Sequence, residues 1–204
     1  MDTQAVIELF KKQHYYLSSG QLSDYRVHTS LIRKMVDQGQ LEQVKRGLYR
    51  LPAECIPDEG QFTIDYFDAV IAVPKGIFCL TTALHYHGLT TQRPVQFDMA
   101  IPRTQRTPKL YTASVRYYRF QEPYYSNYVD EIQMKKAVIK IYCKEKSICD
   151  SFRLRRIIGE NVGMESLNTY LKQSKKDINK LLTTASFCKV NHIIEPVVKA
   201  MVGI

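Results

Sequence analysis

Residues 29–51 read TSLIRKMVDQGQLEQVKRGLYRL and carry the clearest structural signals in the chain. Apolar residues three and four positions apart predict an amphipathic helix that begins near Thr29 and buries Leu31, Ile32, Met35 and Val36. Gly39 is a helix-ending signal. Residues 41–44 and 48–51 then read as two short strands, joined by a tight turn through Lys45, Arg46 and Gly47.

Two further helices are predicted upstream, at residues 3–13 and 18–25. Three helices followed by a hairpin are typical of a winged helix-turn-helix, whose third helix enters the major groove of DNA. The alternative is an ordinary amphipathic helix and hairpin with a solvated basic face. Helical periodicity alone does not explain this order of parts, so we predict a winged helix-turn-helix over residues 1–52.

Six side chains of this domain are predicted to contact DNA. Ser30, Arg33 and Lys34 lie opposite the apolar face of the third helix, where they can reach base edges and phosphates. Lys45 and Arg46 lie at the hairpin tip, where a wing contacts the phosphate backbone. Thr29 is either the helix cap or a phosphate contact.

The composition is that of an ordinary soluble globular protein, with 204 residues, 45% of them hydrophobic and 24% charged. No apolar run is long enough to span a bilayer, and the N-terminus does not read as a signal peptide. The five cysteines form no C-x-x-C pair, which favours reduced thiols in a cytoplasm. We therefore expect a cytoplasmic protein with no membrane contact.

The net charge of +9 favours an acidic partner, with nucleic acid first among the candidates. Residues 59–204 carry 21 basic and 13 acidic residues, and so hold most of the excess. A candidate second basic surface lies there, interleaved with tyrosines that could stack bases: Arg103, Arg106, Lys109, Arg116 and Arg119. The alternative is a solvated loop and an edge strand. A further cluster, at Lys146, Arg153, Arg155 and Arg156, reads equally well as solubility charge.

After a linker at residues 53–61, residues 62–204 are predicted to form a mixed second domain. Its strands are expected at residues 95–101, 115–120 and 137–143, the first of them half-buried, and a short helix is expected up to His87. Four short helices follow, at residues 145–158, 164–173, 177–185 and 193–201. The state of residues 62–73 is left open. The predicted fold class is α+β.

The sequence contains no motif that supports an enzyme. His85 and His87 lie on different faces of the predicted helix, so no metal site is expected. His87 instead suits an interaction with the last helical carbonyls. Asp65 and Asp68 read as the polar face of a short helix, and no phosphate-binding or hydrolase motif is present, so we expect neither a catalytic residue nor a cofactor.

Several motifs together resemble the AbiEi family, the antitoxin half of bacterial type IV toxin–antitoxin systems. In the segment Gly76–Arg103 the matching residues are Thr81, Ala83, Leu84, His87, Gly88, Leu89, Pro94, Ile101 and Pro102. The hairpin Val44–Tyr49 is similar to the family's val–arg–arg–gly–val–tyr, and Ser147–Asp150 resembles its arg–thr–leu–x–asp helix start. The chain departs from the family at Phe78–Thr81, where Ser-His is common, and at Lys146-Ser147, where Arg-Thr is common.

The resemblance implies a protein of two functions. Its winged domain would bind double-stranded DNA at inverted repeats in its own promoter and repress transcription. Its second domain, residues 62–204, would counteract an AbiEii-type nucleotidyltransferase toxin, with or without direct contact. The alternative is a stand-alone winged-helix regulator whose C-terminal domain binds a partner or an effector; a module for protein contact alone is the third option.

Overall fold

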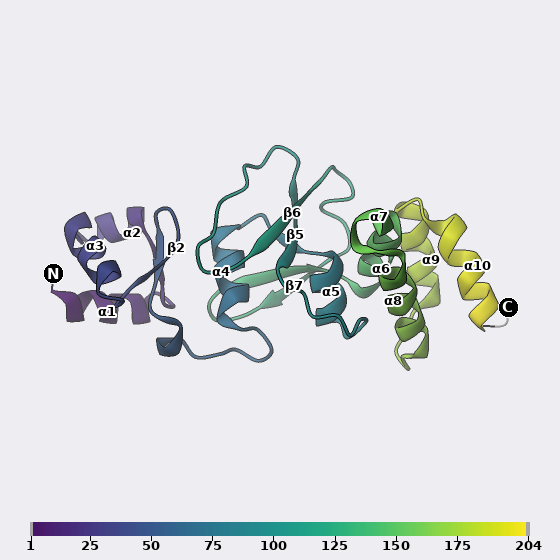
Figure 1. Ribbon diagram of the computed structural model, residues 1–204, viewed down its shortest axis with the longest axis horizontal. Helices are drawn as coiled ribbons and strands as arrows, with labels where there is room; N and C mark the ends of the chain where they lie inside the picture. Colours follow the sequence, from purple (N-terminus) through teal and green to yellow (C-terminus); the bar gives the residue numbers. More distant parts are fainter. Residues whose placement is uncertain (1, 203–204) are drawn as a thin grey trace. The chain divides into compact units, whose positions relative to one another are not determined.

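The computed structural model describes residues 2–202, which form a mixed α+β structure of helices and two sheets (Figure 1). The chain divides into two compact units. The first comprises the chain up to Gly76 together with Arg106–Val115 and Ile132–Ile139, and the second comprises the remainder. The first unit therefore extends past the linker and the boundary at residue 62 that were expected from the sequence.

The first unit begins with the predicted helices and a small antiparallel sheet. Helices α1 (Thr3–Lys12), α2 (Ser19–Asp24) and α3 (Thr29–Asp37) are followed by strands β2 (Glu42–Lys45) and β3 (Leu48–Arg50). Strand β1 (Tyr16–Ser18) was not predicted; it pairs with β3 and gives the sheet order β1-β3-β2. The fully buried side chains of this part include Val6, Phe10, Leu17, Leu22, Met35 and Val44.

The segment that the sequence left open forms helix α4 (Ile64–Ala72) of the first unit. A one-turn helix at Ala53–Cys55 precedes it, within the stretch expected to be a linker. Phe67, Ala69 and Ala72 give α4 its buried face. Asp68 is buried as well, which the sequence interpretation of a polar face did not foresee.

Most of the second sheet lies in the second unit, with the strand order β6-β5-β4-β8-β7. The strands are β4 (Ile77–Phe78), β5 (Phe97–Pro102), β6 (Val115–Phe120), β7 (Val129–Gln133) and β8 (Val138–Tyr142). Strand β4 pairs antiparallel with β5 and parallel with β8.

The expectation of a half-buried strand over residues 95–101 was wrong. Val95 is 99% exposed and lies outside β5, whereas Asp98, Met99, Ala100 and Ile101 are all buried. Strand β5 lies between two neighbours in the sheet, and helix α5 (Leu80–Tyr86) also packs against it. Because successive residues of a strand point to opposite faces, four buried residues in a row mean that both faces of β5 are covered, and no solvent face is left for an alternating pattern to mark.

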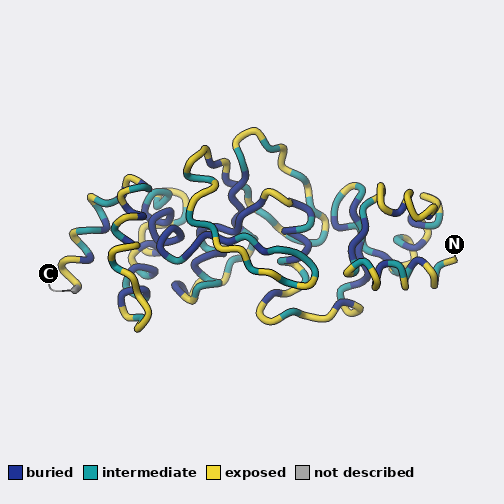
Figure 2. The backbone as a smooth tube through the Cα atoms, turned by 180° about the vertical axis from the view of Figure 1, so that it is seen from behind, coloured by how far each residue is buried: buried dark blue, intermediate teal, exposed yellow. Residues whose placement is uncertain are grey.

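The C-terminal helices pack around α6 (Lys144–Arg153), which contacts α5, α8 (Glu160–Lys172) and α9 (Ile178–Phe187). The expected single helix over residues 145–158 is interrupted at Leu154, so α7 (Arg155–Ile158) is separate. Helix α10 (Asn191–Val202) packs on α9. Figure 2 shows buried residues along the strands and inner helices and exposed ones on the connecting loops. Of the helices in residues 2–202, none has the length and apolar character needed to cross a bilayer.

Candidate nucleic-acid interface

Helix α3 begins with a histidine cap. The His28 Nδ1 atom accepts a hydrogen bond from the backbone N–H of Ser30 at 3.3 Å and lies 2.7 Å from the Ser30 hydroxyl. Because Nδ1 accepts from the backbone, the Ser30 hydroxyl must donate to it as well. His28 is therefore the N-cap, and the expectation that Thr29 might cap the helix was wrong.

The remaining side chains of α3 divide only partly as the periodicity predicts. Ile32 and Met35 are buried at 4% and 0% exposure, and they anchor the helix to the core. Leu31 and Val36, which were expected to be buried as well, are only half-buried. The four predicted contact residues of this helix are all exposed: Thr29, Ser30, Arg33 and Lys34. One face of α3 is thus free to meet a partner and carries two cations.

A groove of about 330 Å³ runs between α3 and the two hairpin strands. Its lining comprises Thr29, Ile32, Arg33, Val36, Asp37, Gln43 and Tyr49. Gln43 and Tyr49 face each other across the β2–β3 pair, and the sequence analysis did not name either residue. Their shared face follows from the strand register, since directly opposed residues point to the same side of a sheet. The register itself was not available from sequence.

Lys45 is not at the hairpin tip. Its Nζ atom donates a hydrogen bond of 2.6 Å to the backbone carbonyl of Ala72, at the end of α4. Burial lowers the pKa of this ammonium below its usual range. The structure thus gives Lys45 an internal partner in place of the free phosphate contact that the sequence predicts.

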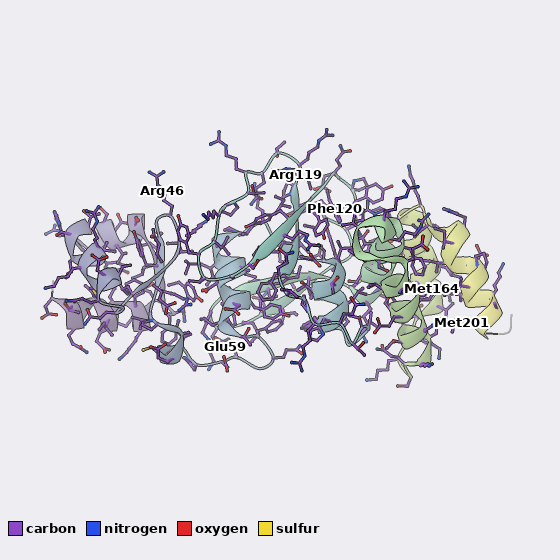
Figure 3. The ribbon with its side chains drawn as sticks, in the orientation of Figure 1. Arg46, Glu59, Arg119, Phe120, Met164 and Met201 are labelled. Carbon is purple, nitrogen blue, oxygen red and sulfur yellow. The ribbon has the colours of Figure 1, made fainter. Side chains whose placement is uncertain are left out.

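Arg46 alone of the two turn cations is exposed, and Figure 3 shows its side chain extending from the tip of the β2–β3 hairpin. Gly47 has a positive φ of 76°, which closes the turn. The free edge of β2 is covered by a later segment. The Tyr111 N–H donates to the Val44 carbonyl at 2.8 Å, and the backbones of Lys45 and Leu110 form an isolated antiparallel β-bridge. At the turn itself, Arg46 is thus the basic side chain that is accessible to a partner.

The residues of the candidate second basic surface are divided between the two units. Arg106 and Lys109 belong to the segment Arg106–Val115 of the first unit, whereas Arg103, Arg116 and Arg119 belong to the second. Arg116 is engaged on β6. Its Nε donates to the side-chain oxygen of Gln96 at 3.0 Å when the oxygen and nitrogen of that amide are assigned so that both find partners. Its Nη1 lies 3.5 Å from the Tyr118 hydroxyl.

Two members of that set, Arg103 and Arg119, line a separate pocket together with Arg153. The remaining cluster of basic residues on the C-terminal helices is not a uniform solvated face either. Lys146 is fully buried beside Asp150, and Arg155 lies 3.6 Å from Glu160.

His87 has a structural role. It is the C-cap of α5, and its backbone N–H donates to the Ala83 carbonyl at 3.0 Å, as its place at the helix end suggests. Its side chain, however, turns to β8, where Nε2 donates to the Tyr142 carbonyl at 2.8 Å. Burial lowers the pKa of His87 below its usual range. Among residues 2–202, no three potential ligands come together as a metal site would require.

Comparison with known proteins supports a regulatory assignment for the N-terminal part. Residues 4–52 match a family described as "Transcriptional regulator, AbiEi antitoxin". No curated protein matches the chain. The matched range begins in α1 and ends just after β3, and so contains α3, the groove and the hairpin. Over residues 4–52 the chain is thus similar to the AbiEi antitoxin family of transcriptional regulators.

Proposed function

We propose that this protein is a DNA-binding repressor of its own promoter and the antitoxin of a type IV toxin–antitoxin system. Residues 1–52 act as a winged helix-turn-helix, in which α3 enters the major groove and Arg46 contacts the backbone beside it. The match of residues 4–52 to a family of antitoxin regulators is the observation that carries the proposal.

The geometry of α3 supports DNA as the partner. Ser30, Arg33 and Lys34 are exposed on a helix whose opposite face is buried, so the helix can insert without losing its core contacts. Asp37, the last residue of α3, is the acidic residue that lines the groove, and its carboxylate would repel DNA phosphates there. Binding would therefore centre on the exposed residues from Ser30 to Lys34, before the helix ends at Asp37.

The proposal is tested by titrating the purified full-length protein into its own upstream region and into unrelated DNA of equal length, each at two salt concentrations. Tight, selective binding that weakens with salt is expected, because each phosphate contact releases counterions. Equal and weak binding to both DNAs would contradict sequence-specific recognition. Absence of any salt-dependent binding would favour a module for protein contact.

The antitoxin function is tested by co-expression with a neighbouring nucleotidyltransferase gene. Restored growth is expected when the full chain is present. A pull-down between the two proteins separates neutralisation by contact from neutralisation through the toxin's target. The second candidate is a stand-alone regulator: the matched family is described as a transcriptional regulator as well as an antitoxin, and failure to restore growth would support this candidate.

A further inference from the structure

A pocket in the second unit concentrates positive charge that the proposed DNA-binding surface does not use. It has a volume of about 370 Å³ and is lined by Arg103, Arg119, Phe120, Gln121, Tyr124 and Arg153. These residues come from the end of β5, the end of β6, the turn after it and the last residue of α6. The fold thus brings together arginines that are about fifty positions apart in sequence.

Arg153 is held in place before any ligand arrives. Its Nε donates to Asp150 Oδ1 at 3.0 Å, and its Nη2 lies 2.9 Å from the same oxygen. The guanidinium carbon lies 4.6 Å from the ring centre of Phe120 and 4.9 Å from that of Tyr124. A guanidinium fixed on two rings and a carboxylate loses little freedom when it binds an anion.

The charge around Asp150 is unbalanced in favour of cations. Asp150 is fully buried, and its second oxygen accepts from Lys146, which is fully buried too. One carboxylate therefore serves both Lys146 and Arg153. Arg103 and Arg119 are exposed and form no ion pair with another residue in the part of the chain described. The nearby acid Glu122 bonds instead to the N–H and hydroxyl of Ser126.

We propose that this pocket binds a terminal phosphate or phosphoanhydride group, carried either by a free nucleotide or by the 5′ end of a nucleic acid. Guanidinium groups pair with phosphate oxygens through two parallel hydrogen bonds, and three of them suit a group with several negative charges. The ligand is recognised through its phosphates and not its base, because Arg153 already lies over the rings of Phe120 and Tyr124.

The shape of the pocket favours a chain end over a continuous backbone. A strand that tracks along a protein uses an extended positive groove. Here three arginines line one hollow, and Arg116 of the same strand β6 is engaged by Gln96 and Tyr118 and does not line it. Figure 3 labels Arg119 and Phe120, adjacent residues of β6 that both line the pocket.

The test measures binding of tripolyphosphate, ATP and two single-stranded RNAs to the full chain. The RNAs share one sequence and differ in a 5′-triphosphate or a 5′-hydroxyl. Arg119→Gln and Arg103→Gln are each expected to weaken binding of the phosphate probes at least about tenfold, in line with the loss of a charge-assisted contact. The matched control is Arg106→Gln, which removes an exposed arginine that does not line the pocket and should change affinity less than about twofold.

Comparing the affinities of these probes distinguishes the two sources of the phosphate. Binding of ATP as tight as that of the 5′-triphosphate RNA identifies a free nucleotide, and much tighter binding of the RNA identifies a strand end. The proposal is overturned if neither tripolyphosphate nor ATP nor the triphosphate RNA binds. It also fails if the 5′-hydroxyl RNA binds equally well, or if the control variant loses as much affinity. Operator binding, measured on the same variants, stays unchanged, so this inference and the proposed function fail separately.

Discussion

Arg50 of β3 and Asp68 of α4 form a buried ion pair, in which the Arg50 Nε atom lies 2.9 and 3.1 Å from the two carboxylate oxygens of Asp68. The Tyr16 hydroxyl donates to the same carboxylate at 2.7 Å, so β1 and β3 are both tied to α4. Asp68 is fully buried and Arg50 is 3% exposed. The family match ends at residue 52, yet the sheet it contains is anchored to a helix that begins twelve residues later, at Ile64.

Replacing Asp68 with alanine is expected to lower the free energy of unfolding by about 3–5 kcal/mol, because Arg50 would remain buried without its carboxylate. The matched control is Glu42→Ala. Glu42 pairs with the same arginine at 2.8 Å but is 38% exposed, so its loss should cost about 0–1 kcal/mol. Urea denaturation of both variants measures the difference. Equal losses would mean that the buried pair is no more important than the surface one.

Arg33→Ala is expected to reduce operator affinity by about 1–3 kcal/mol and to relax specificity at one base position, if Arg33 makes a bidentate base contact from the groove. Arg156→Ala, on exposed α7, is the control with the same change of charge. Fluorescence titration of both variants against operator variants gives the result. If the Arg33 variant bound the operator as tightly as the parent does, the proposal that α3 enters the major groove would be contradicted.

The two turn cations are expected to behave differently. Arg46→Ala should weaken binding to every DNA sequence, since Arg46 is exposed at the hairpin tip. The slope of log affinity against log salt concentration should fall by about 1, as expected for the loss of one phosphate contact. Lys45→Ala should change DNA affinity less, because its ammonium bonds to the Ala72 carbonyl, and should lower stability instead. Salt titrations and thermal denaturation of the pair decide this. A larger loss of DNA affinity at Lys45 would contradict the structure.

Local signals were strong enough to predict the three N-terminal helices and the β2–β3 hairpin, though not strand β1. The alternation of Ile32 and Met35 with exposed residues, and the positive φ of Gly39 and Gly47, are consequences of periodicity and backbone chemistry that are visible in the sequence. Contacts between residues far apart in the sequence could not be predicted from it. Nothing near Arg50 points to Asp68 as its partner, and nothing near Lys45 points to Ala72.

The same limit explains the second basic surface. Arg103 and Arg119 were grouped with Arg106, Lys109 and Arg116 because they are close in sequence. The fold instead groups the first two with Arg153, through the ends of two strands and a helix. Lys146 was grouped with Arg153, Arg155 and Arg156 in a cluster that read equally well as solubility charge. The structure buries it beside Asp150, one helical turn later, and over the rings of Phe120 and Tyr142.

Asp150→Ala is expected to destabilise the second unit by about 3–5 kcal/mol and more than Lys146→Met does. The first change leaves two cations, Lys146 and Arg153, without their shared carboxylate. The second removes one buried charge and keeps the pair of Asp150 with Arg153. Chemical denaturation of both variants measures the order. If Lys146→Met were the more damaging change, packing of the lysine on Tyr142 and Phe120 would outweigh the ionic contacts.

Acid is expected to weaken the packing of α6 through Glu145. Burial alone would raise the pKa of this carboxyl, but hydrogen bonds from Lys180 and Tyr170 outweigh burial and leave the pKa below its usual range. A lowered folded-state pKa gives stability that is present above the unfolded value of about 4.3 and is lost as the pH falls through the folded value.

The parent should therefore be more stable than Glu145→Gln near neutral pH, and the difference should shrink as the pH falls below about 4.3. The distances involved are 2.7 Å from the Tyr170 hydroxyl and 2.9 Å from the Lys180 Nζ, so the pair fastens α6 to both α8 and α9. The same substitution at the exposed Glu54 controls for the loss of one surface carboxylate. Denaturation curves at several pH values decide the matter. A gap between parent and variant that stays constant would show that the Glu145 carboxylate contributes no net charge-dependent stability.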